Sequence, residues 1–110
     1  MSYSTNYSDI SDGLTRVRAR FAEESQIRQD RLLILVSQLQ DASAAPAALV
    51  EIGEINHKIA GTAATLGYPD LGAGAAEVDE MIHQSTLVNP ELLIKIDNVI
   101  SKLEDVQTSK

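Results

Sequence analysis

The sequence of 110 residues contains no cysteine and no tryptophan, and its aromatic residues are limited to 3 tyrosines and 1 phenylalanine. Without cysteine the chain can form neither disulfides nor thiolate metal sites. With so few aromatic residues, the core must be built from aliphatic side chains and alanine. No apolar run approaches the roughly 20 residues that cross a membrane. The first residues lack the basic and apolar regions of a signal peptide, so we expect a cytoplasmic protein.

Basic residues are also few: 9 Lys and Arg stand against 16 Asp and Glu, which gives a formal net charge of -7 at pH 7. Nucleic-acid binding requires a basic surface, so we expect no nucleic-acid partner. Hydrophobic residues make up 44% of the chain and charged residues 23%, which is typical of a folded domain and not of a disordered chain. A chain of this length forms a single domain.

Proline is scarce, and its 3 positions divide the chain, because proline is excluded from helix interiors. Residues 1–8 show no periodicity, so we expect a loose tail followed by one domain over residues 9–110. The first helical stretch runs from about Ser11 to Gln40, as one long helix or as two shorter ones. Its apolar residues at helical spacing are Leu14, Val17, Phe21, Leu32, Leu35 and Leu39.

The second predicted helix has the most regular apolar stripe of the chain. It runs from about Ala47 to Leu66, and its apolar residues recur every three or four positions. Gly67 follows the last of them, and Pro69 comes two residues later. This order indicates a helix end, because glycine accepts a left-handed conformation and proline prevents continuation. The stripe consists of Leu49, Ile52, Ile55, Ile59, Ala63 and Leu66.

The third and fourth predicted helices begin with recognisable start signals. Pro69 and Asp70 suit a helix N-terminus, since proline fits the first position and a carboxylate favours the positive end of the helix dipole. Asn89 and Pro90 form an N-cap followed by a first-position proline. The two stripes are Leu71, Ala75, Val78 and Ile82, and then Leu92, Ile96, Val99, Leu103 and Val106. Four amphipathic helices with short links predict an all-α, antiparallel up-down four-helix bundle.

One histidine of the second predicted helix lies away from the stripe. On a wheel of about 100° per residue, His57 falls about 160° from the stripe's centre, so we expect it to face solvent. Gly53 lies one turn before it on the same face, Gly61 one turn after it, and Ala64 two turns after it. A glycine inside a helix costs about 1 kcal/mol relative to alanine. The two glycines either leave the imidazole open to a large partner or allow another helix to pack closely.

The segment from His57 to Gly72 resembles the signature of histidine-containing phosphotransfer (HPt) domains, four-helix bundles that relay phosphoryl groups in phosphorelays. The shared residues are His57, Gly61, Thr62, Leu66, Gly67, Leu71, Gly72 and Ala75. Many family members carry a lysine three residues after the histidine, where this chain has Ala60. The basic residue here is Lys58, directly after the histidine.

The resemblance implies that His57 accepts a phosphoryl group through Nε2 from an aspartyl phosphate on a receiver domain and passes it to another receiver. The partners would be receiver domains of a histidine kinase, of response regulators or of both. The receiver would supply Mg²⁺, so we expect no cofactor or metal site in this chain. We expect a monomeric carrier without autonomous kinase activity. The residues that would border the binding site are Gly53, Lys58, Gly61, Thr62 and Ala64.

Two other functions are compatible with such a bundle. The protein could bind a receiver without chemistry, since its core would look the same. It also has two Glu-x-x-His motifs, as di-iron bundles do. The candidate iron ligands would be Glu54, His57, Glu80, His83, Glu23 or Glu24, and Glu104. The four motif residues face away from the apolar stripes on the wheel, whereas di-iron ligands project inward, so the sequence favours phosphotransfer. We interpret His83 and the acidic cluster Glu77, Asp79 and Glu80 as solvated surface residues.

Overall fold

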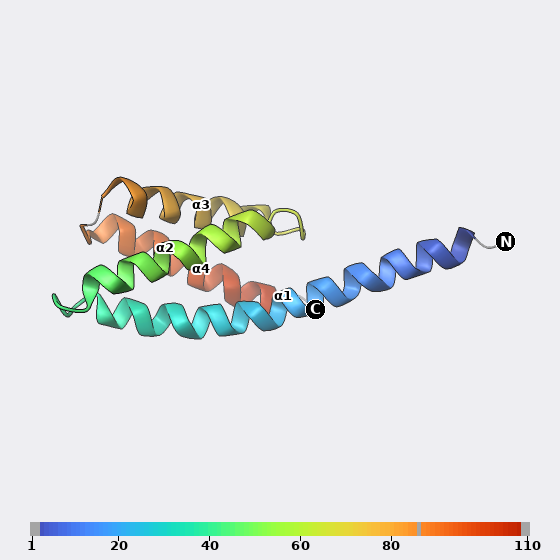
Figure 1. Ribbon diagram of the computed structural model, residues 1–110, viewed down its shortest axis with the longest axis horizontal. Helices are drawn as coiled ribbons and strands as arrows, with labels where there is room; N and C mark the ends of the chain where they lie inside the picture. Colours follow the sequence, from blue (N-terminus) through green and yellow to red (C-terminus); the bar gives the residue numbers. More distant parts are fainter. Residues whose placement is uncertain (1–2, 86, 109–110) are drawn as a thin grey trace.

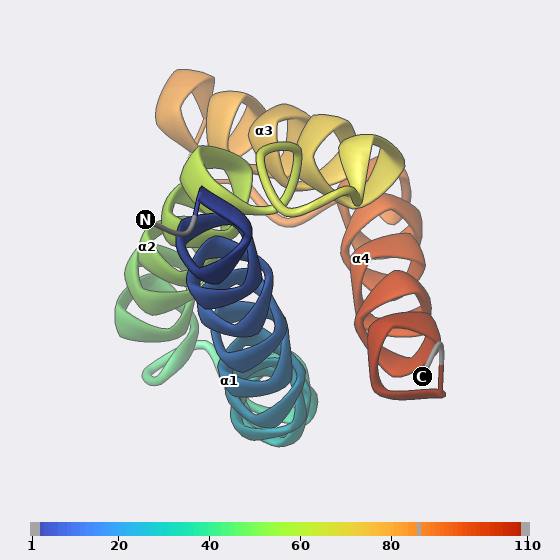
Figure 2. The same ribbon diagram turned by 90° about the vertical axis from the view of Figure 1, so that its right-hand side faces the viewer.

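A computed structural model describes residues 3–85 and 87–108, with side chains from residue 12 onward. This part of the chain folds into α1 (Tyr3–Gln38), α2 (Ala45–Thr62), α3 (Pro69–Gln84) and α4 (Pro90–Thr108). Each helix contacts the next one, and α4 closes the bundle against α1. Figures 1 and 2 show the resulting antiparallel arrangement, which confirms the predicted all-α four-helix bundle. None of the described helices is both long enough and apolar enough to cross a membrane.

Helix α1 is continuous and much longer than its partners. It begins at Tyr3, so residues 3–8 are helical where we expected an irregular tail. Its N-terminal part nevertheless lies apart from the bundle (Figure 1). Among the side chains that are described, Phe21 is the first one buried along α1, whereas Leu14 and Val17 remain 49% and 47% exposed. These two residues of the predicted stripe stay uncovered because the other helices do not reach this far.

The apolar stripes meet in an aliphatic core, as the scarcity of aromatic residues requires. The predicted residues of α2, α3 and α4 are buried, except that Ile55, Leu66 and Ile82 are only partly covered. Burying one such aliphatic side chain stabilises the fold by about 1.5–3 kcal/mol. Phe21 stacks on Tyr68 with the ring centroids 5.7 Å apart, which ties α1 to the α2–α3 connection.

Gly67 fixes the connection between α2 and α3. Its φ of 99° lies in the left-handed region that favours glycine. The Tyr68 N–H donates to the Ala63 carbonyl at 2.9 Å, and the Gly67 N–H donates to the Ala64 carbonyl at 3.1 Å. This pair of bonds is a Schellman motif. Turns therefore continue beyond the regular part of α2 to Leu66, where the sequence predicts the helix end.

The starts of α3 and α4 also follow the sequence signals. Pro69 is the first residue of α3, and Asp70 lies in its first turn. The Oδ1 of Asn89 accepts a hydrogen bond from the Leu92 N–H at 2.8 Å, which is the predicted N-cap of α4. These local signals fix where α3 and α4 begin.

Candidate functional site

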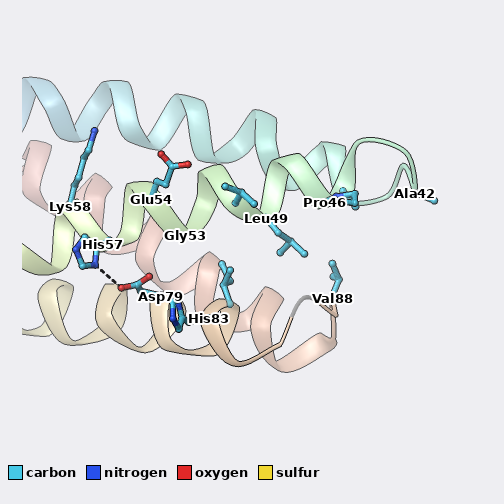
Figure 3. A pocket seen from close by; sticks show the side chains of 13 residues that line it. Ala42, Pro46, Leu49, Gly53, Glu54, His57, Lys58, Asp79, His83 and Val88 are labelled. Carbon is cyan, nitrogen blue, oxygen red and sulfur yellow. Dashed lines mark hydrogen bonds and ion pairs between the residues drawn. The ribbon is translucent and has the colours of Figure 1, made fainter.

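The imidazole of His57 is held at one edge of the α2–α3 interface. Its side chain is 78% exposed, as predicted, and its Nδ1 lies 2.9 Å from Oδ2 of Asp79 on α3 (Figure 3). A carboxylate only accepts hydrogen bonds, so this contact places a proton on Nδ1. In the neutral ring the lone pair then resides on Nε2. The contact with Asp79 thus selects which ring nitrogen can act as a nucleophile.

Asp79 contacts His57 and is the residue of the candidate site that sequence reasoning missed. The acidic cluster around it is not simply a solvated face, because its members have different partners. Glu77 forms an ion pair with Lys95 on α4, which raises the pKa of that lysine. Asp79 pairs with His57 across the helix interface, whereas the Glu80 carboxylate accepts a hydrogen bond from Gln84 on its own helix. Nothing in the residue types or their spacing along α3 distinguishes Asp79 from its neighbours.

Gly53 is buried, although the wheel placed it on the exposed face with His57. A Cβ at this position would lie 3.4 Å from Cγ2 of Ile82 on α3. The close-packing interpretation of the glycine therefore applies here. Helix α2 is covered on two sides, by the core and by α3. The helical wheel identifies only the side that faces the core, so it does not predict the side that α3 covers. The absence of a side chain at residue 53 lets α3 approach α2 one turn away from His57.

The other predicted site residues are exposed but do not all gather around the imidazole. Gly61 lies in open space, since a Cβ there would meet no atom within 4 Å. Ala64 is also exposed, so the surface that follows His57 along α2 carries no long side chain at these two positions. The Thr62 hydroxyl donates to the Lys58 carbonyl at 3.0 Å and is engaged within its own helix. Figure 3 shows the Lys58 side chain projecting away from His57.

A groove of about 780 Å³ extends from His57 along the α2–α3 interface (Figure 3). Polar side chains line the end near the histidine, including Glu54, Asp79 and His83. The rest of the groove is mainly apolar, and Val50 is 60% exposed within it. The apolar lining consists of Ala42, Ala45, Pro46, Leu49, Val50, Ile82 and Val88. A concave, mainly apolar surface that ends at an exposed imidazole is typical of a site that binds a ligand or a partner.

The two Glu-x-x-His motifs do not converge on the bundle core. Glu54, His57, Glu80 and His83 are all exposed, as the wheel predicted. Among the side chains that the structure describes, those of residues 12–85 and 87–108, no group of three or more His, Asp or Glu is placed to hold a metal ion. Since di-iron ligands project inward from facing helices, this geometry disfavours the di-iron alternative.

The function has to be inferred from the local geometry of the site. Comparison of the chain with family models, with curated proteins and with solved structures found no match. The observations that bear on function are therefore the exposed His57, its contact with Asp79, and the adjoining groove.

Proposed function

We propose that the protein is a histidine phosphotransfer carrier of a two-component phosphorelay. In this proposal His57 accepts a phosphoryl group from an aspartyl phosphate on one receiver domain and passes it to a second receiver. The observation that carries the proposal is the 2.9 Å contact between Nδ1 of His57 and Oδ2 of Asp79, on an imidazole that is 78% exposed. The contact directs the lone pair to Nε2, and the exposure admits a donor as large as a protein domain.

The transfer step balances without an additional base on this chain. The Nε2 lone pair attacks phosphorus, and the bond from phosphorus to the receiver's aspartyl oxygen breaks. The receiver's carboxylate leaves with the electron pair, and the histidine becomes a phosphorylated imidazolium that keeps its Nδ1 proton. The Asp79 carboxylate stabilises this positive ring, as a carboxylate stabilises imidazolium in catalytic triads. In the second transfer, an aspartate of another receiver attacks phosphorus, and Nε2 leaves with the electron pair.

The groups that lie near His57 determine what this chain and the receiver would each contribute to the transfer. This chain supplies the nucleophile, its orientation by Asp79 and a docking surface in the α2–α3 groove. The receiver would supply Mg²⁺, which neutralises charge on the transferred group. Because Lys58 projects away from His57, we assign charge neutralisation to the receiver and not to this lysine. The protein would therefore be a carrier and not a kinase, and it would work in the cytoplasm together with its receivers.

The proposal is tested by following radiolabelled phosphate from receiver to carrier. Response-regulator receiver domains, labelled with acetyl phosphate in the presence of Mg²⁺, are mixed with this protein. We expect acid-labile, base-stable label on the wild-type chain. The variant His57→Gln should carry no label, whereas His83→Gln should be labelled like the wild type. No label on the wild type with any receiver of a broad panel would contradict the proposal. Binding of a receiver without transfer would instead support the alternative of a binding module.

Asp79 has a matched control one residue away, because Glu80 is also an acidic residue of α3 but bonds to Gln84 and not to His57. We expect Asp79→Asn to slow transfer about fivefold, which corresponds to about 1 kcal/mol for a solvent-screened ion pair. Glu80→Gln is expected to leave the rate unchanged. Equal rates for wild type and Asp79→Asn would show that the carboxylate does not act on the imidazole.

A further inference from the structure

Glu54 is a free carboxylate beside the imidazole of His57. It lies three residues before the histidine on α2, so the two side chains are neighbours on the helix surface. It is exposed and lines the α2–α3 groove. None of the described side chains forms a hydrogen bond or an ion pair with it. Asp79, by contrast, is engaged by His57, and its carboxylate and that of Glu54 lie on different sides of the imidazole (Figure 3).

One row of residues runs along the outward face of α2 and the turn after it. Their spacings of four and three keep each of them within about 40° of the row's centre, at 100° per residue. All five are exposed, and the histidine is the middle one. The glutamate is the only acidic or basic residue of the row besides this histidine. The row consists of Val50, Glu54, His57, Gly61 and Ala64.

A receiver that brings its aspartate to Nε2 of His57 has to cover Glu54 as well. A protein interface of ordinary size buries about 800 Å² on each partner, which is far more than the area of one side chain. Docking would therefore remove water from the carboxylate, and the rest of the groove is mainly apolar. An ionised carboxylate that loses its water without gaining a partner opposes binding strongly.

The compensating cation has to come from the docking protein. Lys58 lies four residues after Glu54, a spacing at which the two could pair, but they form no ion pair in the structure. Figure 3 shows their charged groups apart. The net charge of -7 acts in the same direction, because it attracts a basic surface as that surface approaches.

We propose that Glu54 selects receivers by forming an ion pair with a lysine or arginine of their docking face. The inference rests on the proposed phosphotransfer and adds the chemistry of the partner. The preferred receiver carries apolar side chains that pack along the groove near Val50 and a basic side chain level with Glu54. A receiver with a neutral or acidic residue at that level leaves the carboxylate without a partner and is rejected.

Initial rates of phosphotransfer, measured against the concentration of labelled receiver domain, separate docking from chemistry. With receivers that label the wild type, Glu54→Gln is expected to raise the half-saturating concentration about tenfold, which corresponds to about 1.4 kcal/mol. The rate at saturation should stay unchanged, because Asp79 and His57 are intact. The control Glu104→Gln removes the same charge from an exposed residue of α4, which does not line the groove, and should behave like the wild type.

The outcomes distinguish this inference from the proposed function. A wild type that is labelled, with an unchanged half-saturating concentration in Glu54→Gln, would overturn the inference alone. So would an equal effect of Glu104→Gln, which would show that only the net charge matters, or a fall confined to the rate at saturation. A wild type that no receiver labels would overturn both.

An exchange of charges identifies the basic side chain of the partner. Each exposed lysine or arginine of a labelled receiver is changed singly to glutamate and tested with the wild type and with Glu54→Lys. One receiver variant should dock poorly with the wild type and recover with Glu54→Lys, since the pair is then restored with reversed charges. Recovery at no position would overturn the direct ion pair.

Discussion

Substitutions of Gly61 are expected to change the stability of the fold and the rate of phosphotransfer in opposite directions. It lies inside α2, one turn after His57, and a Cβ there would meet no atom within 4 Å. No close contact therefore requires a glycine at this position, and the backbone conformation does not require one either. On this account it is present because a side chain there would obstruct a docking receiver.

The size of the stability change follows from this open environment. Gly61→Ala gains helix propensity and reduces the freedom of the unfolded chain, together about 0.5–1 kcal/mol. For a domain of this size, such a gain raises the melting temperature by about 4–8 °C per kcal/mol. Gly72→Ala is the matched control, because its Cβ would lie 3.3 Å from the Ala64 backbone nitrogen. We expect this second variant to be destabilised by overpacking.

The assay combines thermal and urea unfolding with phosphotransfer from a labelled receiver. Gly61→Ala is expected to be more stable than the wild type, and Gly61→Gln, with a longer side chain, to transfer more slowly while remaining helical. Loss of stability in Gly61→Ala would refute the structural argument. Normal transfer by Gly61→Gln would refute the argument that the surface must stay clear.

Three further predictions concern a cap, an ion pair and the groove. Asn89→Ala removes the side chain that caps α4 and should lower the free energy of unfolding by about 1 kcal/mol, with most of the loss restored by Asn89→Asp in urea unfolding. The hydrogen bond from Arg31 holds the pKa of Glu51 below its ordinary range. This contact therefore stabilises the fold above the ordinary glutamate pKa, and the contribution disappears as the pH falls through the lowered value. Arg31→Ala should thus be destabilised at neutral pH and equal to wild type in acid; an equal difference at both pH values would contradict this assignment. Val50→Asp changes a residue that is 60% exposed in the groove, so it should weaken receiver binding in titration calorimetry without lowering the melting temperature. Unchanged binding would show that receivers dock elsewhere.

The helix ends were predictable because they depend on local chemistry. Gly67 takes a left-handed conformation and Pro69 begins α3, as their residue types suggest. The Asn89 side chain caps α4, again as predicted. The periodic stripes of α2, α3 and α4 likewise identify their buried faces, since each stripe reports which side of its own helix avoids water. The stripes do not indicate how far a helix extends beyond its neighbours, so the exposure of Leu14 was not predicted.

The candidate site was predictable only in part, because its second half comes from another helix. The exposure of His57 follows from its position opposite the apolar stripe. Its contact with Asp79 depends on the register of α2 against α3, which no short motif encodes. That register relies on the close approach at Gly53, a residue that the wheel assigned to the surface. The groove likewise belongs to a pair of helices and has no signature in either one alone.

The most direct test of the account is to determine which nitrogen carries the phosphoryl group. The protein is treated with phosphoramidate and examined by phosphorus and nitrogen NMR, and the chain contains only 2 histidines, which simplifies the assignment. The contact of Nδ1 with Asp79 predicts that Nε2 of His57 is phosphorylated and that the group then passes to a receiver in the presence of Mg²⁺. Phosphorylation at Nδ1 of His57, or chiefly at His83, would contradict the account.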